Sequence, residues 1–445
     1  MADIFPFRGI RYDTEKVGTL ANVTTPPYDV ISDEEQDMYY ERHPNNVIRL
    51  DKGKTSPGDN AQDNPYTRAA AYYKNWLADG VLRKDETPCF YLTTVEFGVN
   101  ENKVIRYGLI GRVRLEPFEN GVILPHEETY SKIKSERLEL MKACNANFSH
   151  IFSIYTDKDN LVGKLKAAVS NLPPEEAFTD DAGHHHKMWC LDDPGLQAEI
   201  TAALKERRLF IADGHHRYET ALTYRDWVAG QSPEFGPDHP ANFIMMYLCA
   251  IEDEGLTILP THRLLTRVPE SERNSFVRKA DHYFDVQTFS FAEGPQEQQK
   301  AQAAMLDALE SNPDRHMIGG YIKGCPEFYV FTLKPEVMKQ KFESEIPAPL
   351  RELDVTVLTR IILTELLDFD HADLDNETLI NYTSSALDAI AAVDNGDYNM
   401  AFILNPPSNE QVRQIAEAGH TMPRKTTFYY PKAITGQVMN SLTES

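Results

Sequence analysis

The segment from Leu209 to Leu222 constrains the fold of this chain more than any other. Its first four residues form a short apolar run that predicts a strand, and Asp213-Gly214 predicts a turn. The residues from His215 onward follow the pattern of an amphipathic helix. The segment therefore predicts a strand that passes through a tight turn directly into a helix.

Strands and helices alternate in this way along the whole chain. The clearest strands are predicted at 89–97, 104–115, 151–155, 186–191 and 242–251, and the clearest helices at 66–78, 194–205 and 353–367. Interleaved helices and strands are typical of mixed α/β (α+β) proteins, and we predict this class. Four segments are predicted: 1–120, 121–240 with the Asp213 turn, 241–345 and 346–445.

The turn at Asp213 predicts an anion-binding site. A helix N-terminus carries unpaired N–H groups and a partial positive charge, so cations placed there cost stability unless an anion offsets them. His215, His216 and Arg217 stand at this position, directly after Gly214. A phosphate bound at the helix N-terminus would offset them, with Asp213 beside it as a base or a metal ligand. A purely structural role, with Asp213 as helix cap, leaves these three residues unexplained.

Other segments carry side chains suited to proton transfer or to oxyanion binding: His126 and Glu127 within 125–129, Arg263, and Arg424, Lys425 and Thr426. Each also has a structural explanation, as an exposed acidic turn or as the solvated end of a strand. The run His184–His186 does not predict a metal site, because consecutive residues of a strand point to opposite faces.

The charge balance excludes some partners. The formal net charge of −23 disfavours binding to nucleic acid or to anionic lipid, which depends on Lys and Arg. The five cysteines are widely spaced, as in proteins with free thiols in a reducing compartment. With no signal peptide or membrane-spanning run evident, we predict a cytoplasmic protein. The common phosphate-loop, dinucleotide, nucleophile-elbow and zinc-protease signatures are absent from the sequence.

The chain resembles the domain-of-unknown-function family 1015. The segments that carry the resemblance occur in order along most of the sequence: Pro27–Ile31, Leu124–Glu127, Ile211–Tyr218, Pro260–Arg263 and Met422–Lys432. The family name implies no settled activity.

A shorter resemblance concerns the Asp213 turn alone. Asp213 to Arg217 is similar to the phosphate-binding turn of the ParB/sulfiredoxin-like fold, and most similar to that of free-serine kinases. The resemblance implies that His215, His216 and Arg217 hold the phosphates of a nucleotide, ATP or ADP, with Asp213 at the transferring group. Sulfiredoxins carry a reactive cysteine between the glycine and the histidine, and this chain has none there. The basic helical module of ParB-type DNA binding is also missing.

These observations lead to a nucleotide-dependent phosphotransferase with a small hydroxyl metabolite, such as serine, as acceptor. Asp213 or Glu127 would take the hydroxyl proton, and Mg²⁺ is expected from the chemistry alone. Two alternatives stay open: a phosphatase or nucleotide hydrolase, for example acting on phosphoserine, and a nucleotide-binding regulatory protein without turnover.

Overall fold

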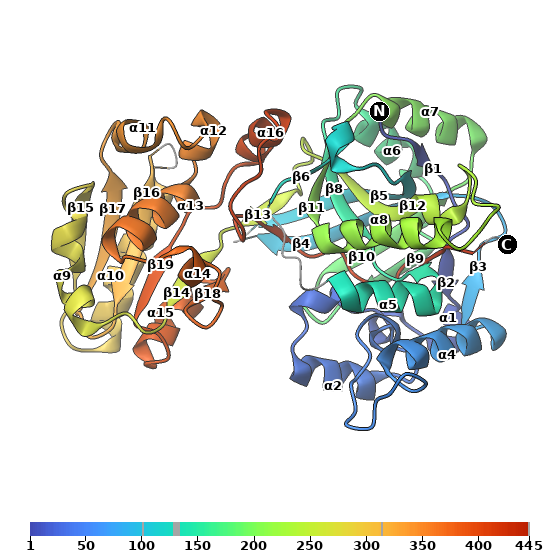
Figure 1. Ribbon diagram of the computed structural model, residues 1–445, viewed down its shortest axis with the longest axis horizontal. Coiled ribbons are helices and arrows are strands. Elements are labelled where there is room, and N and C mark those ends of the chain that lie inside the picture. Colours follow the sequence, from blue (N-terminus) through green and yellow to red (C-terminus); the bar gives the residue numbers. More distant parts are fainter. Residues whose placement is uncertain (100–101, 128–133, 313–314, 444–445) are drawn as a thin grey trace. The chain divides into compact units, whose positions relative to one another are not determined.

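The chain folds into two compact units. The computed structural model describes residues 1–99, 102–127, 134–312 and 315–443. Unit 1 comprises Met1–Thr257 together with Pro431–Ser445, and unit 2 comprises Ile258–Tyr430 (Figure 1). Unit 2 is thus an insertion between two parts of unit 1. The four segments predicted from the sequence stay a prediction.

A mixed sheet forms the centre of unit 1. Within the described residues it has nine strands, in the order β6-β11-β8-β12-β5-β4-β10-β9, with β1 beside β5. The bounds are β1 Ile4–Phe5, β4 Phe90–Val99, β5 Asn102–Arg114, β6 Ile123–Pro125, β8 Ile151–Tyr155, β9 Glu176–Thr179, β10 His185–Leu191, β11 Leu209–Asp213 and β12 Phe243–Ala250. The pairs β6–β11 and β8–β12 run parallel, and the other neighbouring pairs are antiparallel.

Apolar helix faces cover this sheet. The helices of unit 1 are α1 Thr14–Val17, α2 Asp33–Arg42, α3 Ile48–Asp51, α4 Pro65–Ala78, α5 Lys134–Cys144, α6 Leu161–Val169, α7 Pro194–Lys205 and α8 His215–Ala229. Leu165 of α6, Ile200 of α7 and Tyr218 of α8 pack into one core with the strand residues Phe90 and Ile211. Helix α7 begins as its sequence predicts, with proline in the first turn and an aspartate side chain as cap.

The last segment of the chain belongs to unit 1. Strand β21 (Asn440–Ser441) pairs with β7 (Ala146–Asn147), and Met439 is buried in a second core with Trp76 of α4 and Leu140 of α5. Short strands β2 (Ile10–Tyr12) and β3 (Leu82–Lys84) lie beside this core. This return of the chain brings the residues that follow Tyr430 back to the large sheet.

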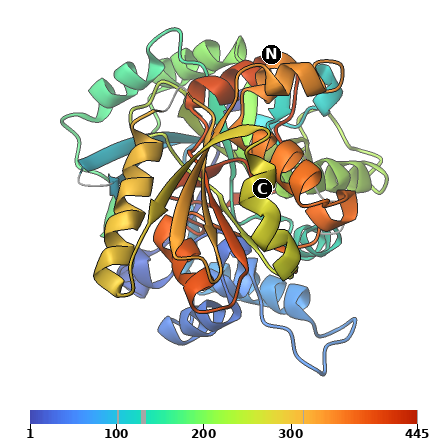
Figure 2. The same ribbon diagram turned by 90° about the vertical axis from the view of Figure 1, so that its left-hand side faces the viewer.

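Unit 2 is a sheet covered by helices on both faces. Its six described strands run in the order β15-β17-β16-β19-β14-β18, all antiparallel: β14 His262–Leu265, β15 Phe284–Ser290, β16 Met317–Ile322, β17 Glu327–Leu333, β18 Ile380–Thr383 and β19 Met400–Ile403. Successive residues of β19 alternate between two cores: Phe402 packs toward α9 (Glu270–Ala280), and Ile403 packs toward α10 (Pro295–Glu310). In Figure 2 the yellow α9 and the gold α10 lie on opposite sides of this sheet.

The remaining helices of unit 2 are α11 Val337–Phe342, α12 Ala348–Arg351, α13 Asp354–Val357, η5 Leu358–Leu366, α14 His371–Leu374, α15 Ala386–Asp394 and α16 Asn409–Glu417. The apolar helix predicted at 353–367 forms α13 followed by the π-helix η5. Apolar spacing predicts a buried helical face but does not distinguish the wider π winding from an α-helix.

Both units confirm the predicted mixed α/β class. All five cysteines are free, as predicted. In the described part of the chain, every helix is too short or too polar to cross a lipid bilayer.

Candidate functional site

The predicted strand–turn–helix lies in unit 1, where its strand β11 is the neighbour of the edge strand β6. Strand β11 ends at Asp213, Gly214 makes the turn, and α8 begins at His215. Strand β6 runs parallel to β11, so the carboxyl ends of both strands meet at the same edge (Figure 1). His126 and Glu127 directly follow β6. The sheet therefore brings together two predicted segments that are far apart in sequence, at the edge where α/β sheets bind ligands.

Asp213 is the centre of a buried charge cluster. Its Oδ1 accepts a hydrogen bond from Lys432 Nζ at 2.8 Å, and its Oδ2 accepts one from Arg217 Nη2 at 2.6 Å. Burial alone raises the pKa of the Asp213 carboxyl, but Lys432 and Arg217 outweigh burial and hold that pKa well below its usual range. The Asp213 carboxylate is therefore ionised at neutral pH and is held between the side chains of Lys432 and Arg217.

Gly214 allows the turn that forms this cluster. Its φ of 92° lies in the left-handed region that favours glycine, and a Cβ there would lie 3.0 Å from the Arg217 guanidinium carbon. Glycine also gives α8 no capping side chain. The helix thus presents its first amide groups and the positive end of its dipole beside Asp213.

The hydrogen-bond partners of His215 and His126 indicate which ring nitrogen of each histidine carries a proton. The backbone N–H of His126 donates to Nε2 of His215 at 3.3 Å, so His215 carries its proton on Nδ1. Burial lowers the pKa of His215 to about 3, with the neighbouring His126 contributing. His215 is therefore neutral at pH 7 and acts as a hydrogen-bond donor, although the sequence suggested a cation there.

His126 and Glu127 form a pair suited to proton transfer. Nδ1 of His126 bonds to the carbonyl oxygen of Ile211, which can only accept, so Nδ1 carries a proton. The other ring nitrogen, Nε2, lies 3.3 Å from Oε1 of Glu127. Glu128 and Thr129, which belong to the same predicted segment, lie outside the described residues.

Two functional candidates in this cluster were missed by sequence reasoning. Lys432 lies shortly after strand β20 (Phe428–Tyr430), and its place in the segment Met422–Lys432 was the available signal. His150 accepts from Arg217 through its backbone carbonyl. Its imidazole is 3% exposed, and neither ring nitrogen has a hydrogen-bond partner among the described residues.

A small polar cavity adjoins Lys432. It has a volume of about 20 Å³ and is lined by His150, Lys432, Arg106 and Gln437 among others. Burial lowers the pKa of His150 to about 3, with Arg217 contributing, so this imidazole is neutral. Nε2 of Gln437 is also buried without a partner in the described part of the chain. Buried polar atoms of this kind are stabilised by a ligand or water that completes their hydrogen bonds.

The other predicted site residues belong to unit 2. The guanidinium of Arg263 lies 5.0 Å from the Tyr382 ring centre, and Lys425 Nζ lies 5.9 Å from the same ring. Arg424 forms an ion pair of 2.7 Å with Asp375, and the Thr426 hydroxyl donates to the Pro423 carbonyl. Within unit 2, the cationic groups of Arg263 and Lys425 thus both lie near the Tyr382 ring, whereas Arg424 forms an ion pair with Asp375.

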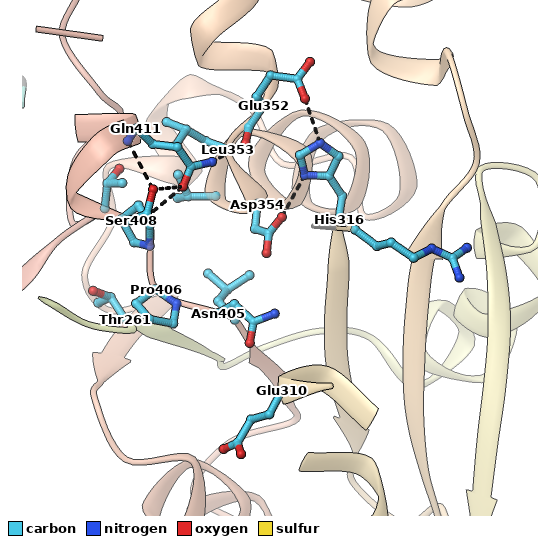
Figure 3. Close-up of a pocket in the computed structure, with 15 residues that line it drawn as sticks. Thr261, Glu310, His316, Glu352, Leu353, Asp354, Asn405, Pro406, Ser408 and Gln411 are labelled. Atoms are coloured by element: carbon cyan, nitrogen blue, oxygen red, sulfur yellow. Dashed lines mark hydrogen bonds and ion pairs between the residues drawn. The ribbon is translucent and has the colours of Figure 1, made fainter. Parts of the chain in front are cut away.

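Unit 2 also contains a cavity of about 620 Å³, which Thr426 helps to line (Figure 3). His316 is held in it between two acids: Nδ1 lies 2.9 Å from Oδ1 of Asp354, and Nε2 lies 3.3 Å from Oε2 of Glu352. The hydrogen bond to Asp354 raises the pKa of His316 above its ordinary value. No residue predicted for the chemistry other than Thr426 is among those lining this cavity.

Comparison with known proteins gives a family and distant structural neighbours. The family model described as "Protein of unknown function (DUF1015)" matches residues 4–356. None of the curated proteins matches the chain.

The similar solved structures include a conserved hypothetical protein from Pyrococcus furiosus, with 12% identity and a TM-score of 0.34 over 74% of this chain and 94% of that one. A variant of a free serine kinase in complex with ADP has 11% identity and a TM-score of 0.37 over 74% and 90%. C-terminally truncated SbnI from Staphylococcus aureus has 11% identity and a TM-score of 0.34 over 74% and 86%. Likeness at this level does not establish a shared fold or activity.

Proposed function

The chain belongs to the DUF1015 family, and we propose that it is a nucleotide-dependent phosphotransferase that acts on a small hydroxyl metabolite, with serine as the first acceptor to test. The observation that carries the proposal is the Asp213 cluster. An acid, the buried Arg217, the partly buried Lys432 and a helix N-terminus meet there at the carboxyl ends of two parallel strands. This combination favours a phosphate ligand over a neutral one.

Asp213 positions the cations in this proposal. A carboxylate whose pKa lies below its usual range is a weak base, because general bases work best when their pKa lies near the operating pH. Its two oxygens are already committed to Lys432 and Arg217. Asp213 would keep both donors in place and ionised, and the phosphates of the nucleotide would then share them.

Glu127, with His126, is the better candidate for the proton of the acceptor hydroxyl. The Glu127 side chain is 14% exposed, and its Oε1 lies 3.3 Å from Nε2 of His126. His215 would donate through Nδ1 to a phosphate oxygen without adding charge. His216, the second residue of α8, is partly buried beside it. In unit 2, the predicted residues Arg263, Arg424, Lys425 and Thr426 stay candidates for binding phosphate.

Mg²⁺ fits this site only in part. It prefers oxygen ligands, and the carboxylates that the cluster offers are Asp213 and Glu127. Asp213 already accepts from two cations. The ion would therefore bind to the phosphates of the nucleotide, where it would neutralise charge.

The proposal is tested by ³¹P NMR of the full chain with Mg²⁺, ATP or ADP, and pooled hydroxyl metabolites that include L-serine. A new phosphomonoester signal is expected. Inorganic phosphate without an acceptor product would replace the proposal with a hydrolase. Bound nucleotide with an unchanged spectrum would replace it with a nucleotide sensor, and absence of binding would refute all three.

Glu127→Gln separates chemistry from binding. We expect about a 10²–10⁴-fold loss of turnover, the usual contribution of a general base, with nucleotide affinity retained. The matched control is Glu199→Gln, which changes an exposed glutamate of unit 1 that pairs with Lys164. Full activity of Glu127→Gln would show that another group takes the proton.

A further inference from the structure

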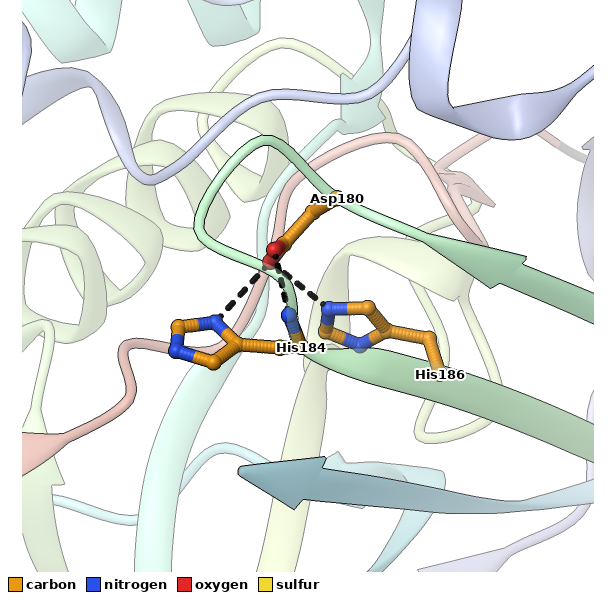
Figure 4. A group of neighbouring side chains, drawn as sticks. All are labelled: Asp180, His184 and His186. Atoms are coloured by element: carbon orange, nitrogen blue, oxygen red, sulfur yellow. Dashed lines mark hydrogen bonds and ion pairs between the residues drawn. The ribbon is translucent and has the colours of Figure 1, made fainter. Parts of the chain in front are cut away.

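Asp180, His184 and His186 form a compact cluster in unit 1 (Figure 4). Oδ2 of Asp180 lies 3.0 Å from Nδ1 of His184 and 2.9 Å from Nε2 of His186. All three potential ligand atoms lie within 4.8 Å of one another. The two histidines are buried, at 8% and 6% exposure, and the Asp180 side chain is 22% exposed.

The hairpin of β9 and β10 explains why these residues meet. Side chains alternate along a strand, so His184 and His186 point to one face while His185 points to the other. Nδ1 of His185 bonds instead to the Thr179 hydroxyl at 2.8 Å. The three histidines thus point alternately to the two faces, as residues of a strand do. His184 and His186, which share a face, both contact Asp180, a residue of the preceding turn.

The turn fixes Asp180 in its orientation. Its Oδ1 accepts from the backbone N–H of Ala182 at 3.0 Å and from that of His184 at 2.9 Å, which leaves Oδ2 directed at the two imidazoles. Gly183, with φ of 79°, lets the chain reverse here. The His186 ring stacks on Phe178 with ring centres 5.0 Å apart. Metal ligands are commonly held in orientation by further contacts of this kind.

We propose that Asp180, His184 and His186 bind one divalent transition-metal ion of the Zn²⁺ type. Imidazole nitrogen and one carboxylate oxygen suit Zn²⁺ and its neighbours in the first row, whereas Mg²⁺ prefers oxygen ligands throughout. With metal–ligand bonds of about 2.0–2.1 Å, tetrahedral ligands lie about 3.3 Å apart. To admit the ion, the two Oδ2–nitrogen distances would open by about 0.3–0.4 Å, and the two imidazole nitrogens, which lie within 4.8 Å of each other, would also have to reach that separation.

The ion takes the place of the protons that the imidazoles now direct at Oδ2. Each histidine binds it as a neutral ring, with its remaining proton on the other nitrogen. Three protein ligands leave a fourth position for water or a ligand atom, as in zinc sites that are not purely structural. His186 also lines the small cavity that contains Lys432 and His150. The metal site is independent of the proposed phosphotransfer and does not rest on it.

The test measures metal binding by the full chain after treatment with a chelator. Titration with ZnCl₂ is followed by calorimetry, and titration with CoCl₂ by its visible absorption, which reports coordination geometry. One equivalent is expected to bind. His186→Gln and Asp180→Asn, which retain hydrogen-bonding groups and so favour an intact fold, are expected to weaken binding at least tenfold.

His185→Gln is the matched control, because it changes the neighbouring histidine on the opposite face. It is expected to bind metal as the unsubstituted chain does. Equal loss in this control, or less than one equivalent bound by the unsubstituted chain, would overturn the proposal.

X-ray absorption of the Zn²⁺-loaded, unsubstituted chain provides a test that needs no variant. A first shell of nitrogen and oxygen alone is expected. A sulfur shell would assign the ion to cysteines and would also overturn the proposal.

Discussion

Replacing Lys432 by Met removes one cation from the buried Asp213 cluster. The two side chains are 13% and 16% exposed, and their ion pair is 2.8 Å long. Breaking a buried ion pair from one side costs about 3–5 kcal/mol. Arg217 keeps its own bond to the same carboxylate, and both groups retain some solvent. We therefore expect a loss of about 2–3 kcal/mol in the free energy of unfolding of unit 1.

Tryptophan fluorescence reports this loss selectively. The three tryptophans of the chain, Trp76, Trp189 and Trp227, all belong to unit 1. Urea unfolding followed by fluorescence should show a lower midpoint with an unchanged slope. In a thermal experiment the transition of unit 1 should fall by roughly 4–10 °C.

The same substitution at Lys164 is the matched control. Lys164 pairs with Glu199, and both side chains are about half exposed, so Lys164→Met should leave the urea midpoint nearly unchanged. Equal losses in the two variants, or a Lys432→Met protein within about 0.5 kcal/mol of the unsubstituted chain, would refute the assignment of a buried charge cluster.

The pH dependence gives a second check on the same pair. The folded-state pKa of Asp213 is depressed, so its contribution to stability is complete above the unfolded pKa of about 3.9 and is lost as pH falls toward the folded value. The difference in stability between Lys432→Met and the unsubstituted chain should therefore narrow below about pH 4.

Two further predictions concern other parts of the chain. Gly214→Ala forces a left-handed conformation on alanine and places its Cβ 3.0 Å from the Arg217 guanidinium, so unit 1 should lose about 1–3 kcal/mol by tryptophan fluorescence; unchanged stability would contradict the described turn. In unit 2, the raised pKa of His316 beside Asp354 contributes stability that is complete below about pH 6.5 and is lost as pH rises through the folded value. Circular dichroism of His316→Gln should show a flatter decline over that pH range, and an identical decline would argue against the ion pair.

Local patterns predicted the elements of the fold better than they predicted contacts between them. The hairpin of β4 and β5, α7 and the Asp213 turn all follow from apolar spacing, proline, glycine and capping residues, which act over a few positions. The return of the last segment of the chain to unit 1 did not follow, because the pairing of β21 with β7 joins residues that are far apart in sequence.

In the candidate site, too, residues close in sequence were predicted, and contacts between distant segments were not. Asp213, Gly214 and Arg217 were predicted because they share one turn, whereas Lys432 is 219 positions away from Asp213 and joins it only through the fold. The charge of His215 depends on burial, which a sequence pattern does not report. Alternation along a strand separates His185 from His184 and His186, but it does not predict that Asp180 in the preceding turn reaches both imidazoles.

The discontinuity of unit 1 has a consequence for synthesis of the protein. A ribosome delivers Asp213 and Arg217 long before Lys432, which emerges only after the whole of unit 2 has been translated. Until then Asp213 has a single cationic partner, and β7 lacks its pairing strand β21. A nascent chain can thus acquire a folded insertion while the charge cluster is still incomplete. Chains that terminate within unit 2 would lack both the Lys432–Asp213 ion pair and the pairing of β7 with β21. Only molecules translated past residue 432 can therefore assemble the Asp213 site.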